Sequence, residues 1–381
     1  MMTMTYIIGT GILKVGDHWE KSLRNLAAEA SILAIEDAGG VSVDYVIVAN
    51  SLSGVVNGQE NLGSYVVSRL NLKGVPALKV EAANASGAAA AIVANSLIKS
   101  GDAKRVLVIG VEKMTDYTSL EDSNAALSTL MDSEYEAFHG ATLDSLHALL
   151  MREYLRKYQV KREDFSYFPI LMHENAVDTP HAQYRFKIDL DAYISSPLVA
   201  EPISMMDVPS PSDGAAAIVL SEKNEGPNGS VKISSFGQAT DRISLYDRKS
   251  LLEMPSIRMA FNRAVSKLNN FKPDFYIIGE YSSVMGYIAT EELGLAERGK
   301  AYKLFMDGEA KRSGPTPINP EGGSKARGDP IGATGVYQLA EAYLQLTGRA
   351  QGWQVNGARR ALVLSIGGVG CNSVVHLVEG V

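Results

Sequence analysis

The first candidate for chemistry is a short turn in residues 80–91, which read VEAANASGAAAA. The pattern runs from a strand-like segment through small residues into an alanine-rich helix, so one side chain is presented at a helix N-terminus. That side chain is Asn84, an amide that forms hydrogen bonds but is neither nucleophilic nor ionisable at pH 7. The turn has the form of a nucleophile loop without a nucleophile.

The other reactive residue types are scattered. Cys371 is the only cysteine, which excludes an internal disulfide and a multi-cysteine metal site. The six histidines show no metal-binding spacing, and His173 has no second histidine one helical turn later. There is no P-loop and no Gly-x-Ser-x-Gly elbow, and the glycines at 368–370 lack the third member of a dinucleotide fingerprint. The sequence therefore favours neither a metal nor a nucleotide cofactor.

Composition narrows the class of partner. The chain has 381 residues, 46% of them hydrophobic and 21% charged, which is typical of a globular protein. A net charge of −7 without a basic run disfavours nucleic-acid binding. We find no signal-peptide pattern, and the longest apolar run, residues 88–94, is far below the ~18 residues that span a bilayer. We expect a cytoplasmic protein with small-molecule and protein partners.

Strand and helix patterns alternate along the first third of the chain. This rhythm predicts a largely parallel sheet with helices on both faces. The expected strands cover residues 6–8, 45–49, 77–81 and 105–109. The expected helices cover residues 22–38, 61–70 and 87–99.

The rhythm lapses at about residues 115–200, where only one helix, 146–158, is clear. We interpret this span as an inserted loop region that builds a site over a rigid scaffold. One order of elements occurs twice, once before this inserted region and once near the C-terminus: a small-residue turn, a helix, a basic pair and an apolar strand. This repeat predicts two similar α/β halves, 1–226 and 227–381.

Several stretches together resemble the thiolase superfamily, most closely its archaeal and sterol-carrier-protein-type branch, which handles acyl-coenzyme A thioesters. The matches run in order along nearly the whole chain, at residues 26–39, 80–87, 110–115, 173–183, 212–217 and 319–328. The resemblance implies a thiolase fold of five layers, αβαβα, built from two duplicated halves with a loop domain inserted in the first. The weak repeat agrees with it.

The family's chemistry requires a cysteine thiolate at a helix N-terminus, where the helix dipole lowers the pKa of the thiol. The resemblance further implies a histidine in a His-Asp-Ala-Phe segment or an asparagine in an Asn-Glu-Ala-Phe segment, a histidine in Gly-His-Pro, and often a second cysteine near the C-terminus. Here Asn84 stands at the nucleophile position. Gly279 stands at the first residue of the His-Asp-Ala-Phe segment, and Asp329 stands at the histidine of Gly-His-Pro. Ser365 stands at the position of the second cysteine, and Cys371 follows it shortly after.

These substitutions argue against the usual reaction. Loss of one general acid or base typically costs about 10²–10⁴-fold in rate. Loss of the nucleophile removes the acyl-enzyme route altogether. Conventional thiolysis through Asn84 is therefore not expected.

The substituted residues leave alternatives open. Asn84 either binds a thioester carbonyl or caps the helix that follows it. Asp329 is either a general base with a raised pKa or the partner of a nearby cation such as Arg327. Glu280 and Tyr281 either form an acid–base pair for carbon–carbon cleavage or pack as ordinary core residues.

Four further residues are assigned by position. Cys371 is either a base or nucleophile, or an ordinary core residue. Met114 is expected to line the pocket wall, and His173 is expected to organise the loop domain and contact substrate. Asn175 is expected to contact substrate as well.

Three functions follow from the resemblance. The first is an acyl-CoA retro-aldolase that uses Asp329, Glu280 and Tyr281 with an OB-fold, zinc-ribbon partner. The second is a non-catalytic scaffold subunit that assembles with another acyl-CoA enzyme. The third keeps the family's acetyl-CoA C-acyltransferase reaction, with Cys371 as a displaced nucleophile. Each implies coenzyme A or acyl-CoA as ligand, no covalently bound cofactor, and a homodimer or homotetramer.

Overall fold

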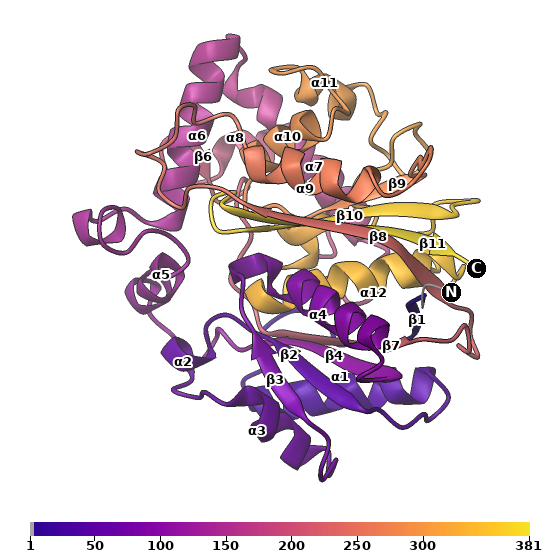
Figure 1. Ribbon diagram of the computed structural model, residues 1–381. Helices are drawn as coiled ribbons and strands as arrows, with labels where there is room; N and C mark the ends of the chain where they lie inside the picture. The colour runs from indigo at the N-terminus through magenta and orange to yellow at the C-terminus, as the bar shows by residue number, and fades with distance from the viewer. Residues whose placement is uncertain (1–3) are drawn as a thin grey trace.

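The computed structural model describes residues 4–381 and contains two β-sheets that face one another across a pair of helices (Figure 1). The strands are hydrogen-bonded in the order β3-β2-β4-β7-β1-β8-β11-β10-β9. The two sheets are joined in one hydrogen-bonded order where Tyr6 pairs with Lys232 and Ile7 with Val231. The first comprises β3 (Ala77–Val80), β2 (Tyr45–Ala49), β4 (Arg105–Glu112), β7 (Gly214–Ser221) and β1 (Tyr6–Ile12). The second comprises β8 (Val231–Thr240), β11 (Asn372–Gly380), β10 (Arg360–Gly367) and β9 (Phe275–Ile278).

Helices complete five layers, αβαβα, as the resemblance implied (Figure 1). The outer face of the first sheet carries α1 (Leu23–Asp37) and α3 (Leu62–Arg69). The central layer is α4 (Ser86–Ser100) and α12 (Thr334–Leu346), which pack in one apolar core with both sheets. The outer face of the second sheet carries α9 (Pro255–Val265) and α10 (Ser283–Glu292). The shorter helices α2 (Ser53–Val56) and α11 (Ala301–Met306) lie in the connections.

The pairing of strands confirms that the fold is built from two duplicated halves. In the first half β3 and β4 both pair with β2 in parallel, and β7 and β1 follow as antiparallel strands. In the second half Ile318 and β10 both pair in parallel with β9, and β11 and β8 follow as antiparallel strands. The predicted boundary at Pro227 lies in the connection between β7 and β8, and division there into two domains stays a prediction.

Strand β1 runs four residues beyond the predicted segment 6–8, because two glycines let a helix pack directly on its backbone. A Cβ atom on Gly9 would lie 2.5 Å from the Ala38 nitrogen, and one on Gly11 would lie 2.1 Å from the Ala30 oxygen. Glycine usually weakens a strand, so the sequence pattern alone ended this one too early.

The inserted region is more helical than predicted. It contains α5 (Leu120–Ser128), α6 (Leu143–Tyr158), α7 (Tyr167–Ala176), α8 (Leu190–Ser195) and the small hairpin β5 (Leu198–Ala200) and β6 (Ile203–Ser204). Only α6 was expected. Helix α7 buries seven of its ten residues, so no polar stripe marks its period in the sequence.

Helices α4 and α12 touch at their first turns. A Cβ atom on Gly87 would lie 2.3 Å from the Val336 nitrogen, and one on Gly335 would lie 2.4 Å from the Ala88 nitrogen. Two glycines at matching positions therefore let the backbones meet, which brings together the turns that precede both helices. Among the described residues, no helix has the length and apolar character that crossing a bilayer requires.

Candidate active site

Two strained turns face each other between the sheets. The 3₁₀ turns Ala83–Ala85 and Ile331–Ala333 lead into α4 and α12. Ala83 has φ 51° and Ile331 has φ 31°, in a region that residues with a Cβ atom seldom adopt. The strain falls at matching positions of the two halves, and such strain is concentrated at functional sites.

Asn84 reaches across this junction to Asp329. Its Nδ2 donates a hydrogen bond of 2.9 Å to Asp329 Oδ2, and both side chains are buried. The other carboxylate oxygen, Oδ1, accepts from Thr334 Oγ1 at 2.6 Å. The Oγ of Ser86, and not Asn84, bonds the backbone of the turn, to Ala83 O and Ala82 N. Asn84 is therefore no helix cap; it links the two halves through a carboxylate.

The pKa of Asp329 is raised above its usual value because the carboxyl group is buried. The hydrogen bond from Thr334, the charge of Arg327 and the hydrogen bond from Asn84 lower it in part. The ion pair of Arg327, however, is with Glu341, whose Oε1 lies 3.2 Å from Nε. Asp329 is thus held by neutral donors, and not by Arg327 as the alternative from sequence had it.

Glu280 is the second buried acid beside this junction. Its Oε1 accepts from the Lys325 backbone nitrogen at 2.9 Å, and its Oε2 accepts from Asn319 Nδ2 at 3.2 Å. Burial raises its pKa well above the usual range, and the negative charges of Glu321 and Asp329 raise it further. The hydrogen bond from the Lys325 backbone and the charge of Arg327 lower the pKa in part, so the net shift favours the protonated form.

Tyr281 follows at the start of α10, and its hydroxyl donates to Asp144 Oδ1 at 3.0 Å. Its ring lies 4.9 Å from that of His147, whose Nδ1 is 2.8 Å from Ser282 Oγ. The pKa of Tyr281 is raised well above its usual value by burial and by Asp144. Burial and the hydrogen bond to Asp144 place the hydroxyl firmly in its neutral, donating form.

The space beside Gly279 is filled by another side chain. A Cβ atom there would lie 3.0 Å from Gln338 Nε2 and 3.2 Å from Leu364 O. Gln338 donates to Leu364 O at 3.1 Å and accepts a short hydrogen bond from Ser365 Oγ. Gln338 and Ser365 thus form a hydrogen-bonded pair, and a side chain at position 279 would press on Gln338 and on the Leu364 carbonyl group.

Cys371 lies in the turn between β10 and β11. Its Sγ is 3.5 Å from Gly367 O, and burial raises the pKa of the thiol, with Arg248 lowering it in part. A thiol with a raised pKa is mainly protonated at neutral pH and is a poor nucleophile. Its role as a base or nucleophile stays a prediction.

A cavity of about 340 Å³ opens beside the acids. Three of its lining residues contact the candidate acid–base groups: the Lys325 nitrogen donates to Glu280, Asp144 accepts from Tyr281, and Pro211 pairs as a β-bridge with Asp329. His173 also lines this cavity. Met114 does not: it is buried in an apolar cluster with Leu52, Leu130 and Ile331.

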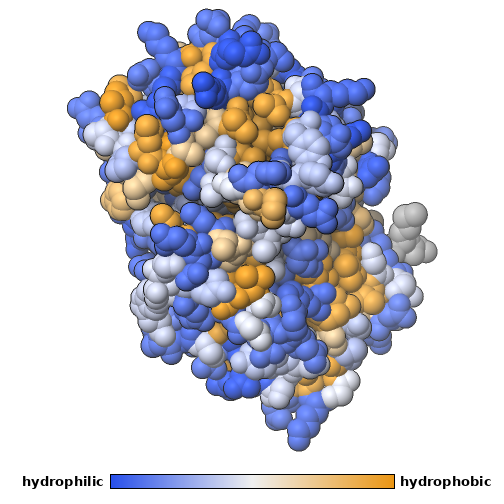
Figure 2. Space-filling view, turned by 90° about the vertical axis from the view of Figure 1, so that its left-hand side faces the viewer, coloured by the Kyte–Doolittle hydropathy of each residue, from blue (hydrophilic) through white to orange (hydrophobic). Residues whose placement is uncertain are grey.

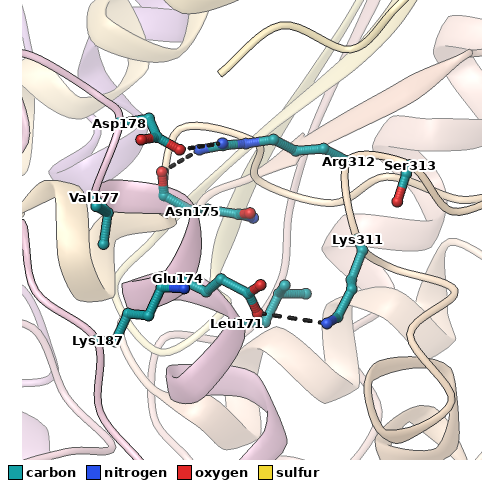
Figure 3. Close-up of a pocket in the computed structure, with 9 residues that line it drawn as sticks. All are labelled: Leu171, Glu174, Asn175, Val177, Asp178, Lys187, Lys311, Arg312 and Ser313. Carbon is teal, nitrogen blue, oxygen red and sulfur yellow. Dashed lines mark hydrogen bonds and ion pairs between the residues drawn. The ribbon is translucent and has the colours of Figure 1, made fainter. Parts of the chain in front are cut away.

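Asn175 lies on another face of α7 from His173, because two residues turn a helix by about 200°. Its Nδ2 donates to Asn319 O at 2.9 Å. It lines a polar depression of about 290 Å³ in which Arg312 bonds Asp178 and the Asn175 carbonyl oxygen, and Lys311 pairs with Glu174 (Figure 3). These ion pairs tie α7 to the chain around Arg312, so Asn175 supports the fold here.

Sequence reasoning missed several residues of the site: Asp144, Thr334, Gln338, Lys325, Glu321 and Glu341. A usable signal existed for two of them, since Glu321 and Lys325 are charged residues in the same glycine-rich turn as Arg327 and Asp329. Glu321 is buried, and burial together with Glu341 raises its pKa to about 8. Within residues 4–381, no group of three or more His, Cys, Asp or Glu side chains is arranged to hold a metal ion.

Comparison with family models gives two matches that together cover most of the chain. Residues 5–224 match the thiolase N-terminal domain, and residues 237–380 match the thiolase C-terminal domain-like family.

Relatives of known sequence agree. The chain is 36% identical over 378 residues to an acetyl-CoA acetyltransferase of Methanothermobacter thermautotrophicus, covering 97% of this chain and 98% of that protein. It is 29% identical to sterol carrier protein 2 of Gallus gallus, covering 96% of this chain and 70% of that protein. Among solved structures, the Ltp2-ChsH2(DUF35) aldolase superposes with a TM-score of 0.85 at 20% identity, covering 99% of this chain and 98% of that one. The expected archaeal and sterol-carrier-protein branch is confirmed.

Proposed function

The chain belongs to the thiolase family, and we propose that it makes or breaks carbon–carbon bonds of acyl-CoA thioesters by acid–base chemistry, without an acyl-enzyme. The observation that carries this proposal is the hydrogen bond between Asn84 and Asp329. It joins an amide at the nucleophile position to a carboxylate at a histidine position. An ionisable group therefore remains at the junction after the nucleophile is gone.

In the cleavage direction the substrate is a 3-hydroxyacyl thioester. Asp329 takes the proton of the C3 hydroxyl, whose electrons form a carbonyl as the C2–C3 bond breaks. The electron pair of that bond passes to C2, which becomes the carbon of a thioester enolate. Protonated Glu280 gives a proton to C2, so the products are a ketone or aldehyde and a shorter acyl thioester.

The electrostatics support these two roles. Burial raises the pKa of Asp329, and the hydrogen bonds from Asn84 and Thr334 lower it in part, which favours the ionised form that a base needs. Glu280 has a pKa raised much further, as an acid requires. Pairs of carboxyl groups whose surroundings separate their pKa values are a common basis for acid and base assignment. After one turnover Asp329 is protonated and Glu280 ionised, and one proton transfer restores both.

We assign Tyr281 the stabilisation of the enolate oxygen. In the structure the hydroxyl donates to Asp144 Oδ1, so this role requires it to turn from Asp144 to the enolate oxygen when substrate binds. Asp144 lines the cavity, so the hydroxyl lies at the cavity wall before it turns. A positioned donor of this kind is typically worth about 10²–10³-fold in rate.

A partner protein is part of the proposal. The solved relative is named as an aldolase of two components, Ltp2 and ChsH2(DUF35). The side of this protein that carries α5 and α6 shows several separate hydrophobic patches (Figure 2). We propose a protein partner for this chain as well, of the OB-fold, zinc-ribbon type, and a homodimer or homotetramer as the oligomer.

The test is turnover of 3-hydroxyacyl-CoA thioesters, with the carbonyl product and the shorter thioester quantified by mass spectrometry. Asp329→Asn should lower kcat by at least about 10²-fold, the usual cost of losing a general base. Asp178→Asn, which removes only the exposed ion pair with Arg312, is the matched control and should keep full activity. Full cleavage by Asp329→Asn would refute the mechanism.

A second candidate is a non-catalytic subunit that binds acyl-CoA. It is favoured by the closed state of Asp329, since both oxygens accept hydrogen bonds and the side chain is 2% exposed. Binding of CoA esters with no cleavage of any 3-hydroxyacyl thioester, alone or with a partner, would support this candidate. Retained thiolysis that disappears in Cys371→Ser would support the acyltransferase instead.

A further inference from the structure

The cavity beside the acids is apolar well beyond the needs of an acetyl group. Its walls include Leu120, Phe186, Val199, Met205, Met206 and Val208. Four of these side chains remain substantially in contact with solvent, with exposed fractions of 72% for Leu120, 50% for Phe186, 43% for Val199 and 54% for Met205. Apolar side chains gathered at a cavity mouth are a typical feature of a small-molecule site.

One wall consists of three rings. The ring of His173 lies 6.2 Å from that of Tyr184 at an interplanar angle of 27°, and 5.0 Å from that of Phe186. All three residues line the cavity. Aromatic walls favour flat or cyclic apolar ligands, because ring pairs gain energy beyond the area they bury.

His173 adds one polar requirement. Its Nδ1 lies 3.0 Å from the Phe186 carbonyl oxygen, which can only accept, so Nδ1 carries the proton. Burial lowers the pKa of His173 to about 4, so the ring is neutral at pH 7 and Nε2 is an acceptor. Nε2 is buried and has no hydrogen-bond partner, and the side chain is 1% exposed. A buried acceptor in this state needs a donor, and a ligand that carries one can supply it in place of water.

The volume sets the size of the ligand. Liquid water occupies about 30 Å³ per molecule, so a cavity of about 340 Å³ holds roughly ten groups of the size of a methylene. An acetyl group has three non-hydrogen atoms and would leave most of this space empty. Glu280, Tyr281 and Asp329 do not line the cavity themselves, but Lys325, Asp144 and Pro211 line it and contact them, which favours this side for the reacting end of the substrate.

We propose that this cavity binds a ring-bearing apolar acyl fragment, of roughly ten non-hydrogen atoms, with a hydroxyl or N–H donor that meets His173 Nε2. The inference rests on the proposed function for the position of the thioester. It assigns a substrate class of aromatic or alicyclic acyl-CoA thioesters in place of acetyl-CoA.

The first experiment is calorimetric titration with acetyl-CoA, phenylacetyl-CoA and 4-hydroxyphenylacetyl-CoA. Phenylacetyl-CoA should bind at least tenfold more tightly than acetyl-CoA. Val199→Trp should abolish this preference because it fills the cavity. Leu198→Trp is the matched control, since side chains alternate along β5 and Leu198 does not line the cavity, and it should keep the preference.

The polar requirement is tested with His173→Phe, which keeps a ring and removes the acceptor. The hydroxylated ligand should bind more tightly than phenylacetyl-CoA to the wild type, and this difference should vanish in the variant. Equal binding of acetyl-CoA and phenylacetyl-CoA would overturn the substrate class while leaving the proposed function in place. Failure of all three thioesters to bind would refute both.

Discussion

The hydrogen bond between Asn84 and Asp329 can be measured by a double-mutant cycle. Its partners are an amide and a buried carboxylate 2.9 Å apart. Hydrogen bonds to charged groups contribute about 1.5–3 kcal/mol to stability. Because both side chains are buried, we expect little reduction by solvent screening. Asn84→Ala should therefore lower the free energy of unfolding by about 1.5–3 kcal/mol at pH 7.

The same loss acts on the pKa of Asp329. One unit of pKa corresponds to about 1.36 kcal/mol, so removal of Asn84 should raise the pKa of Asp329 by about one to two. The hydrogen bond from Asn84 lowers the pKa of Asp329, which means that it stabilises the ionised form of this carboxyl group. Near pH 4 both the folded and unfolded chains carry the protonated acid to a large extent. The destabilisation by Asn84→Ala should therefore shrink as the pH falls from 7 to about 4.

The assay is urea unfolding of the wild type, Asn84→Ala, Asp329→Asn and the double variant, at pH 7 and at about pH 4. We expect a coupling energy of about 1.5–3 kcal/mol at pH 7 and a clearly smaller one at the lower pH. Thr334→Val, which removes the donor to the other oxygen, should show the same dependence on pH. Additive effects at pH 7, or a coupling that is the same at both pH values, would refute the reasoning.

Three further outcomes follow from single sites. Gly279→His should destabilise the fold by about 1–3 kcal/mol in urea unfolding, and Gln338→Ala in the same chain should recover part of the loss, since the two side chains compete for one space. His376 is fully buried with both ring nitrogens unpaired, and burial lowers its pKa to about 4. As the pH falls, the unfolded state therefore binds a proton at a higher pH than the folded state does. The free energy of unfolding should fall by up to about 3 kcal/mol between pH 6.5 and pH 4. His376→Leu should abolish that part of the pH dependence, and an unchanged pH dependence would contradict this. Asp213→Ala should lower the free energy of unfolding by about 3–5 kcal/mol, because it leaves the buried Lys113, 2.8 Å away, without that charge partner. A loss of less than about 1 kcal/mol would show that water or another group replaces the Asp213 carboxylate.

Local pattern was sufficient for several individual strands and helices. The strand at 45–49 and the helices near 23–37, 62–69 and 86–100 follow from residue types whose periodicity is read over a few positions. The ordered matches along the chain added the duplication and the αβαβα layers. Helix α7 was not predicted, because its burial on nearly all sides removes the polar stripe by which a helix is recognised in a sequence.

The sequence by itself also determined the chemistry available at position 84, since an amide is not a nucleophile at pH 7 whatever surrounds it. Only the tertiary structure decided what the substituted residues do. Asn84 and Asp329 are 245 positions apart, and their contact depends on two glycine-mediated helix N-termini meeting between the sheets. Whether Asp329 faces Arg327 or an amide, and in which direction the pKa of Glu280 shifts, depends on burial and on charges brought from other segments. Electrostatic interactions depend on distance in space, and distances between remote segments are fixed only when the chain has folded.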